Sequence, residues 1–167
     1  TDRIYEALNF FDQNQAIEKV INLQGDLPTI DQFALKEVLN LLDSAEVDIG
    51  TLVAPFKDFD EMQKAQYVKA ECHFKSNNIK ARANNFTRIA NKEKMENLYH
   101  HVGIYSYRRE ALEKFVKLKQ TNREKEEKLE QLRAIENNMH IEVSLINSPI
   151  LGIDTQEDLD NIREIQK

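Results

Sequence analysis

The tripeptide QGD, at residues 24–26, is the first group in this chain whose residue types could do chemistry. It follows the apolar run VINL and comes just before Pro28. In open α/β sheets, ligands bind beyond the carboxyl ends of the strands, so Asp26 stands where it could hold a metal or a polar ligand. The alternative is a strand-to-helix turn, in which Gly25 provides the bend and Asp26 accepts backbone hydrogen bonds. The spacing alone favours the turn.

A second carboxylate with the same ambiguity is Asp154, in the segment GIDTQEDL. It could share one cation with Asp26. It could also favour the positive end of the last helix, beside a capping box that Thr155 makes with Asp158. The local pattern favours capping, and the long separation in sequence leaves open whether the two carboxylates meet.

The adjacent histidines His100 and His101 lie in the strand-like run NLYHHVGIYSY. Neighbouring residues of a strand point to opposite faces, so the two imidazoles cannot easily bind one zinc ion. One of them could still project into a cleft as a hydrogen-bond donor.

The composition excludes several classes of function. The chain has 167 residues, enough for one domain over residues 1–167, and a net charge of -6 without a basic patch, which argues against nucleic-acid binding. No apolar run is long enough to cross a bilayer, so membrane insertion is not expected. The one cysteine, Cys72, cannot form a disulfide within the chain, which favours a reducing, cytoplasmic setting. The four glycines are scattered, and no glycine-rich phosphate loop occurs.

Helices and strands must position these groups, and the hydrophobic pattern predicts an α/β domain with a mixed sheet and a central β insert. Helices are predicted over residues 1–13, 31–42, 108–118 and 123–137 and at the end of the chain. Strands are predicted over residues 16–24, 47–55, 97–107 and 140–146, the first as a parallel strand covered on both faces. The tetrad KSNN between two extended runs predicts a central hairpin over residues 67–88. The stripe Leu129, Leu132, Ile135 indicates a surface helix packed by its apolar side.

Five segments together resemble the 3-deoxy-manno-octulosonate cytidylyltransferases, also called CMP-Kdo synthetases. They are TDRIYEAL, INLQGDLP, HHVGIYSYRREAL, EKEEKLEQLR and GIDTQEDLDNIR, in the order of that family. The resemblance implies a Rossmann-like nucleotide-diphosphosugar transferase fold, usually in a homodimer. It also implies transfer of CMP from CTP to the acidic sugar 3-deoxy-manno-octulosonate (Kdo), with release of pyrophosphate, for lipopolysaccharide synthesis.

The same resemblance assigns roles to residues. Asp26 and Asp154 resemble the carboxylates that bind the required Mg²⁺, which would neutralise charge on the α-phosphate during attack by the sugar hydroxyl. An acidic sugar needs arginine for its carboxylate and amide, imidazole, carboxylate and phenol groups for its hydroxyls. The residues that resemble this Kdo-binding set are Arg3, Gln24, Arg88, His101, Tyr105, Glu130 and Gln131.

Further expectations follow from the resemblance. In the family, a first strand and a loop rich in Arg, Ser, Gly and Lys hold the CTP phosphates, and this amino-terminal nucleotide-binding part would precede Thr1. The chain by itself is therefore expected to make no CMP-Kdo. Residues 67–88 and 98–107 are expected to form a dimer contact or a lid, because exposed strand edges need a cover. Two alternatives stay open: a sialic-acid cytidylyltransferase on the same fold, or an inactive remnant that acts at most as an association module.

Overall fold

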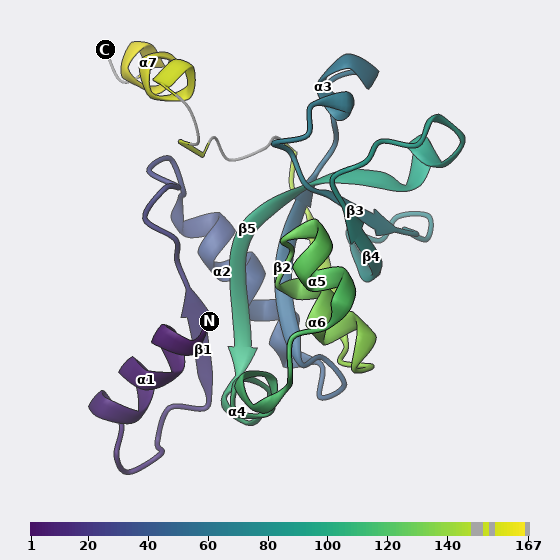
Figure 1. Cartoon of the computed structure of the whole chain (residues 1–167). Helices are drawn as coiled ribbons and strands as arrows, with labels where there is room; N and C mark the ends of the chain where they lie inside the picture. Colours follow the sequence, from purple (N-terminus) through teal and green to yellow (C-terminus); the bar gives the residue numbers. More distant parts are fainter. Residues whose placement is uncertain (148–151, 154–155, 166–167) are drawn as a thin grey trace.

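The structure is a computed structural model, and it describes residues 1–147, 152–153 and 156–165 (Figure 1). Helices and strands alternate along most of the chain, as the hydrophobic pattern predicts. The elements are α1 (Asp2–Phe11), β1 (Lys19–Asn22), α2 (Gln32–Asn40), η1 (Leu41–Asp43), β2 (Ile49–Ala54), α3 (Phe59–Gln63), β3 (Lys69–Cys72), β4 (Lys80–Thr87), η2 (Lys92–Asn97), β5 (Leu98–Arg108), α4 (Arg109–Lys117), α5 (Asn122–Glu127), α6 (Gln131–Glu136), β6 (Ile141–Leu145) and α7 (Gln156–Ile165). No helix in this described part is both long and apolar enough to span a membrane.

The six described strands form one mixed sheet in the order β1-β5-β2-β6-β4-β3. β2 and β6 pair in parallel, and the other neighbours pair antiparallel. β3 also pairs with β5, so the pairings of β2, β6, β4, β3 and β5 return to β2. The sheet therefore curves back on itself at the end where β5 begins.

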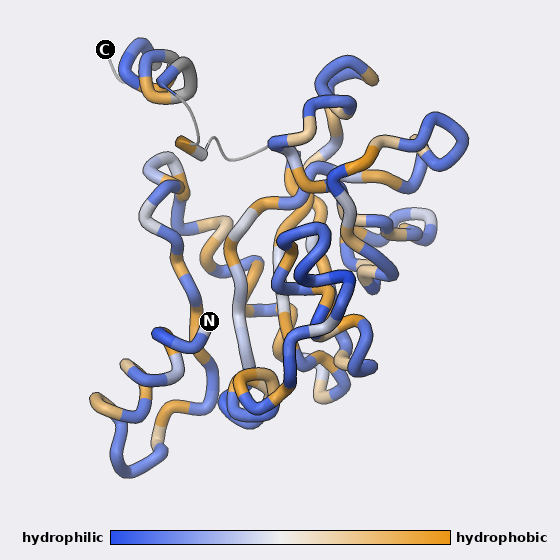
Figure 2. Tube along the Cα trace, in the orientation of Figure 1, coloured by the Kyte–Doolittle hydropathy of each residue, from blue (hydrophilic) through white to orange (hydrophobic). Residues whose placement is uncertain are grey.

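β2 is the centre of the fold, and all six of its residues are buried. Ile49 and Val53 pack into a core that α4 and α6 cover, while Leu52 faces a second core shared with Val38 of α2 and Ile104 of β5. Figure 2 shows mostly apolar or neutral colours along the central strands and mostly hydrophilic colours along α5. The continuous apolar run of β2 is thus explained by helices on both faces.

A close approach between α2 and the sheet depends on Gly50. A Cβ atom at this position would lie 2.8 Å from the carbonyl oxygen of Val38 and 2.5 Å from Oγ of Ser106. Ser106 instead donates its hydroxyl to the Val38 oxygen at 2.5 Å. A residue without a side chain on β2 therefore lets α2 lie directly against the strands.

The first strand differs from the prediction. β1 covers four residues rather than the whole of residues 16–24, and it pairs antiparallel with β5 at the edge of the sheet, half-buried. The Asp12 carboxylate accepts hydrogen bonds from the backbone of Ala16 and Ile17 at 3.0 and 2.8 Å, which holds those residues in a turn. Leu23 is 48% exposed, so the apolar run does not reflect burial on both faces.

The helix predicted over residues 123–137 is two short helices, α5 and α6. Lys128 ends α5 in the left-handed conformation, with φ 55° and ψ 45°, and this breaks the helical path. A buried ion pair from Glu124 to Arg133, with Oε1 and Nη2 2.5 Å apart, holds the two helices against each other. Leu129 and Leu132 are buried, so the apolar stripe packs on the core as predicted.

The hairpin forms as predicted. β3 pairs with β4 and β5, whereas each paired residue of β4 has one strand neighbour: residues 80–82 pair with β6, and residues 83 and 85–87 pair with β3. Part of β4 is therefore an edge, and the dimer contact or lid expected for residues 67–88 and 98–107 stays a prediction.

Candidate functional site

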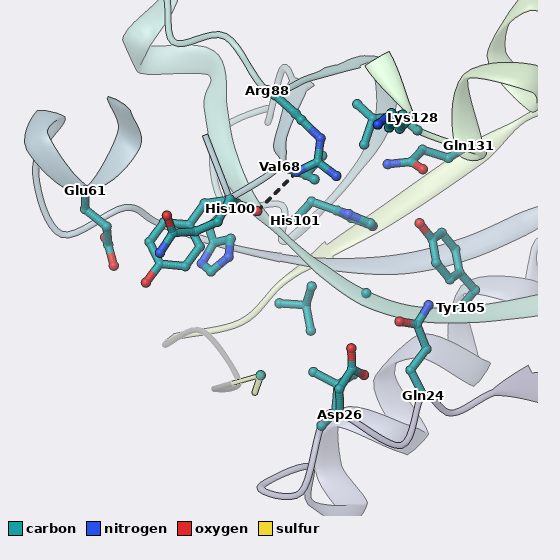
Figure 3. A pocket seen from close by; sticks show the side chains of 17 residues that line it. Gln24, Asp26, Glu61, Val68, Arg88, His100, His101, Tyr105, Lys128 and Gln131 are labelled. Atoms are coloured by element: carbon teal, nitrogen blue, oxygen red, sulfur yellow. Dashed lines mark hydrogen bonds between the residues drawn. The ribbon is translucent and has the colours of Figure 1, made fainter. Parts of the chain in front are cut away.

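A cavity of about 360 Å³ lies where the end of β1, the first half of β5 and the junction of α5 and α6 meet (Figure 3). The loop before β3 and the end of β4 complete its wall. Polar side chains dominate this lining. The lining residues are Gln24, Asp26, Leu27, Glu61, Gln66, Tyr67, Val68, Arg88, His100, His101, Val102, Gly103, Tyr105, Lys128, Leu129, Gln131 and Gly152.

His101 is held in one orientation from β2. Its Nε2 lies 3.0 Å from Oγ1 of Thr51, and that hydroxyl in turn faces the carbonyl oxygens of Ile104 at 2.7 Å and Val102 at 3.1 Å. The hydroxyl proton serves a carbonyl, so Nε2 of His101 donates to Oγ1 and Nδ1 is left as an acceptor. Burial lowers the pKa of His101 to about 3, so the ring is neutral. The sequence analysis expected a histidine that donates a hydrogen bond into a cleft, whereas Nδ1 of His101, the nitrogen not bonded to Thr51, is an acceptor.

His100 and His101 have different neighbours, as adjacent strand residues should. His100 stacks on Phe56 with ring centroids 5.3 Å apart and also meets Tyr67 at 4.7 Å. His101 meets Tyr105 at 5.4 Å. Both histidines nevertheless line the cavity, because it extends around β5. Burial lowers the pKa of His100, and its Nδ1 is buried without a hydrogen-bond partner in the described part of the chain.

Arg88 closes the cavity from the end of β4, and most of its guanidinium is committed to the protein. Nε donates to the carbonyl oxygen of Glu127 at 3.3 Å, and Nη1 donates to those of Ala65 and Gln66 at 3.1 and 3.4 Å. Within the described residues, Nη2 has no such partner. Arg88 is thus fixed by three backbone groups while one nitrogen stays available to a ligand.

The wall formed by residues 64–68 is anchored from behind by Lys69, whose side chain is fully buried. Its ammonium donates to the carbonyl oxygens of Lys64, Tyr67 and Arg88, at 2.8, 2.8 and 2.9 Å. Burial and the nearby Arg88 charge lower the pKa of Lys69. All three donors of the ammonium are used, so Lys69 ties the loop before β3 to the end of β4.

On the other side, the QGD segment borders the cavity with Gln24 and Asp26 (Figure 3). The Asp26 side chain is exposed, and its backbone oxygen accepts a hydrogen bond from Ile153 N at 2.9 Å. Gln24 lies against β5 at Gly103, where a Cβ atom would be in ordinary van der Waals contact with Oε1 of Gln24, at 3.5 Å. Asp154, the residue after Ile153, lies outside the described residues.

The structure gathers most of the sequence-predicted residues around this cavity. Six of them line it: Gln24, Asp26, Arg88, His101, Tyr105 and Gln131. Glu130 lies beside it, in a small adjoining cavity that Tyr105 and Gln131 also line. Burial raises the pKa of Tyr105 well above its ordinary value, so its phenol is a hydrogen-bond donor.

Arg3 is a correction to the predicted grouping. It is not among the residues that line the cavity, and its side chain is exposed in the first turn of α1. α1 places Leu8 in the core, with Ile4 and Tyr5 packed against it, and this orientation leaves position 3 facing solvent. The common cavity expected for Arg3 and His101 is therefore not found.

Four lining residues were given no site role from the sequence. They are Glu61, Gln66, Tyr67 and Lys128. The turn before β3 and the break at Lys128 bring them in, and neither follows from local periodicity. The described residues include no group of three or more His, Cys, Asp or Glu side chains that could hold a metal by themselves.

Comparison with known proteins assigns this fold and cavity to a class. A family model described as cytidylyltransferase matches residues 1–141, and the chain therefore belongs to that family. Its relatives include the 3-deoxy-manno-octulosonate cytidylyltransferase of Bartonella bacilliformis, 46% identical over 165 residues, covering 99% of this chain and 68% of that protein. The enzyme of the same name from Brucella canis is 45% identical over 163 residues, covering 98% of this chain and 65% of that protein. The chain thus spans about two thirds of the length of these relatives.

Solved structures agree with this placement. The structure of CMP:2-keto-3-deoxy-manno-octonic acid synthetase complexed with CTP matches with a TM-score of 0.82 and 26% identity, covering 99% of this chain and 66% of that chain. A UDP-glucose pyrophosphorylase, 13% identical, shares the fold with a TM-score of 0.64, covering 98% of this chain and 61% of that chain. The mixed α/β fold of the nucleotide-sugar transferases, expected from the sequence, is confirmed.

Proposed function

We propose that the protein carrying this sequence is a cytidylyltransferase that joins CMP from CTP to Kdo and releases pyrophosphate, supplying lipopolysaccharide synthesis. The observation that carries the proposal is that six residues of the predicted site line one cavity. Family membership over residues 1–141 and the names of the relatives support the same reaction.

The chemistry of the cavity suits an acidic sugar. Arg88 offers Nη2 to a carboxylate, and Tyr105 offers a phenolic proton. Neutral His101 offers a lone pair at Nδ1 to a hydroxyl, while the amides of Gln24 and Gln131 can both donate and accept. Together these groups hold the sugar in one orientation, which is how positioning lowers a bimolecular barrier.

Magnesium fits the carboxylate side of the cavity, and its binding there is part of the proposal. Mg²⁺ usually takes one or two carboxylates and completes its shell with water and substrate phosphates, so a cage of three protein ligands is not needed. Asp26 would provide one carboxylate, since no described side chain pairs with it. Asp154, next to Ile153 in sequence, would provide the second. When bound, the cation would neutralise negative charge on the phosphate under attack.

The test uses the complete protein that carries this sequence, with CTP, Mg²⁺ and Kdo, and measures released pyrophosphate and CMP-Kdo. Asp26→Asn should lower kcat by about 100-fold or more, because an amide binds the proposed Mg²⁺ more weakly and the cation would no longer neutralise the phosphate in the transition state. Sialic acid in place of Kdo should give no product. Turnover of sialic acid would favour the sialic-acid enzyme, and no product from either sugar would favour an inactive association module.

A homodimer and a cytoplasmic location belong to the proposal as well, on the strength of the family resemblance. Size-exclusion chromatography with light scattering would measure the mass in solution. A monomeric mass at micromolar concentration would remove the dimer from the proposal without affecting the assigned reaction.

A further inference from the structure

We propose that Lys128 is a further binding residue, which contacts the carboxylate of the sugar together with Arg88; this rests on the proposed function. Lys128 lines the cavity beside Leu129 and Gln131, and its side chain is exposed there. Lys128 lies in the segment EKEEKLEQLR that resembles the family, but the resemblance gave it no role, and the segment predicted a continuous surface helix.

The backbone of Lys128 is the first observation. It has φ 55° and ψ 45°, the left-handed conformation in which a Cβ atom is disfavoured and glycine or asparagine is the usual residue. A lysine at this position is therefore costly for folding. A function of the side chain would account for it.

The charge of Lys128 is the second observation. Its ammonium makes no hydrogen bond or ion pair with any residue in the described part of the chain. The carboxylates of Glu124 and Glu130 pair with Arg133 instead, at 2.5 and 3.5 Å. Lys128 is thus a cation at a polar cavity without an internal counterion.

The third observation is that most of the Arg88 guanidinium is already hydrogen-bonded to the protein. Its Nε and Nη1 serve backbone oxygens, so only Nη2 remains among the described contacts. One of those oxygens belongs to Glu127, the residue just before Lys128, so Arg88 also holds the turn that presents the lysine. A carboxylate has two oxygens, and a second cation beside Nη2 would bind the other.

The two cations also give the cavity a direction. Figure 3 shows Arg88 and Lys128 on one side, with Gln24 and Asp26 across from them. An acidic sugar would place its carboxylate at the cationic side. In Kdo the carbon that carries the carboxylate also carries the reacting hydroxyl, so this hydroxyl would lie beside the two cations and face the acidic side, where the nucleotide phosphates and cation are proposed to lie. Lys128 would thereby distinguish sugar acids from neutral sugars.

The test compares Lys128→Gly with the wild-type complete protein, measuring kcat, the KM for Kdo, the KM for CTP and the melting temperature. We expect the KM for Kdo to rise about tenfold or more, as for loss of a charged hydrogen-bond partner, with the KM for CTP unchanged. The melting temperature should stay the same or rise, because glycine relieves the left-handed backbone. If the role of Lys128 were purely structural, Lys128→Gly would instead lower the melting temperature.

Glycine at position 125 would disturb α5, because Lys125 lies inside that helix. The control for charge therefore compares Lys125→Gln with Lys128→Gln. Lys125 is exposed on the same segment and does not line the cavity. Lys125→Gln should keep the wild-type KM for Kdo. An unchanged KM in Lys128→Gly, or equal increases in both glutamine variants, would overturn the inference while leaving the reaction intact. A wild-type protein without CMP-Kdo synthesis would instead remove the proposed function, and Lys128's role with it.

Discussion

At the scale of single residues, the site is built from groups whose charge states are set by burial. His101 is neutral because the protein interior excludes its charged form, and Thr51 selects the nitrogen that carries its proton. Lys69 is fully buried, and its ammonium donates to three carbonyl oxygens, which joins the segments behind the cavity wall. Cys72 is also buried, and burial raises the pKa of its thiol to about 12, which makes it unreactive.

Replacement of the buried ammonium should be costly. Lys69→Met keeps the length of the side chain but leaves three carbonyl oxygens without their donor, and we expect the free energy of unfolding to fall by about 3 kcal/mol. The KM for Kdo should rise as well, because the wall formed by residues 64–68 also holds Arg88. Denaturant unfolding and steady-state kinetics measure the two effects.

The same change at an exposed lysine provides the control. Lys75 is exposed in the turn after β3, and Lys75→Met should alter stability by no more than about 0.5 kcal/mol. Equal stability of the Lys69 and Lys75 variants would show that the three carbonyl contacts contribute little.

At the scale of elements, two buried ion pairs and one glycine decide how helices meet. Arg109 binds Asp12, which joins the start of α4 to the end of α1, and Arg133 binds Glu124 across the α5–α6 break. Gly50 lets α2 approach β2. Each contact joins two elements, and the pair of Arg133 with Glu124 also fixes the α5–α6 junction that lines the cavity.

Gly50→Ala should destabilise the protein by about 1–3 kcal/mol, because the added methyl group would overlap the Val38 oxygen and the Ser106 hydroxyl. The effect is steric, since no described glycine has a positive φ. Gly25→Ala is the matched control: nothing lies within 4 Å of a Cβ there, so its unfolding midpoint in urea should stay near the wild-type value. Comparable losses in the two variants would contradict the close approach at Gly50.

At the scale of the whole molecule, the buried His101 and the half-buried His100 link folding to pH. The pKa of His101 falls from 6.5 to about 3 on folding, so between these values the unfolded chain binds more protons than the folded chain. Stability therefore rises with pH across this window and is lost as pH falls. His100 acts in the same direction, since burial lowers its pKa too.

The expected loss from His101 alone between pH 7.5 and 5.5 is about 1.4 kcal/mol in the free energy of unfolding. The lowered pKa values of Asp12 and Glu124 matter only in more acidic solution. Urea unfolding at several pH values would measure the slope. His101→Gln should flatten it, and His73→Gln, at an exposed position, should keep it. A slope that His101→Gln leaves unchanged would mean that the imidazole is protonated in the folded protein.

The sequence by itself determined the class of fold, most of the elements and most of the cavity. The apolar run of β2, the KSNN turn and the stripe of Leu129 and Leu132 are local patterns, and the structure contains what they predict. Such patterns are readable because the periodicity of side chains along a helix or strand depends on neighbouring residues alone.

Only the tertiary structure decided which strands pair and which charges become buried. β1 pairs antiparallel at an edge, Lys128 breaks a helix that its neighbours favour, and Lys69 enters the interior. These outcomes depend on contacts outside the local pattern. β5 lies far along the chain from β1, the Arg88 carbonyl lies 19 residues from Lys69, and Arg133 meets Glu124, nine residues earlier, across the α5–α6 break. A local pattern carries no information about such partners, because pairing and burial free energies arise only when distant segments meet.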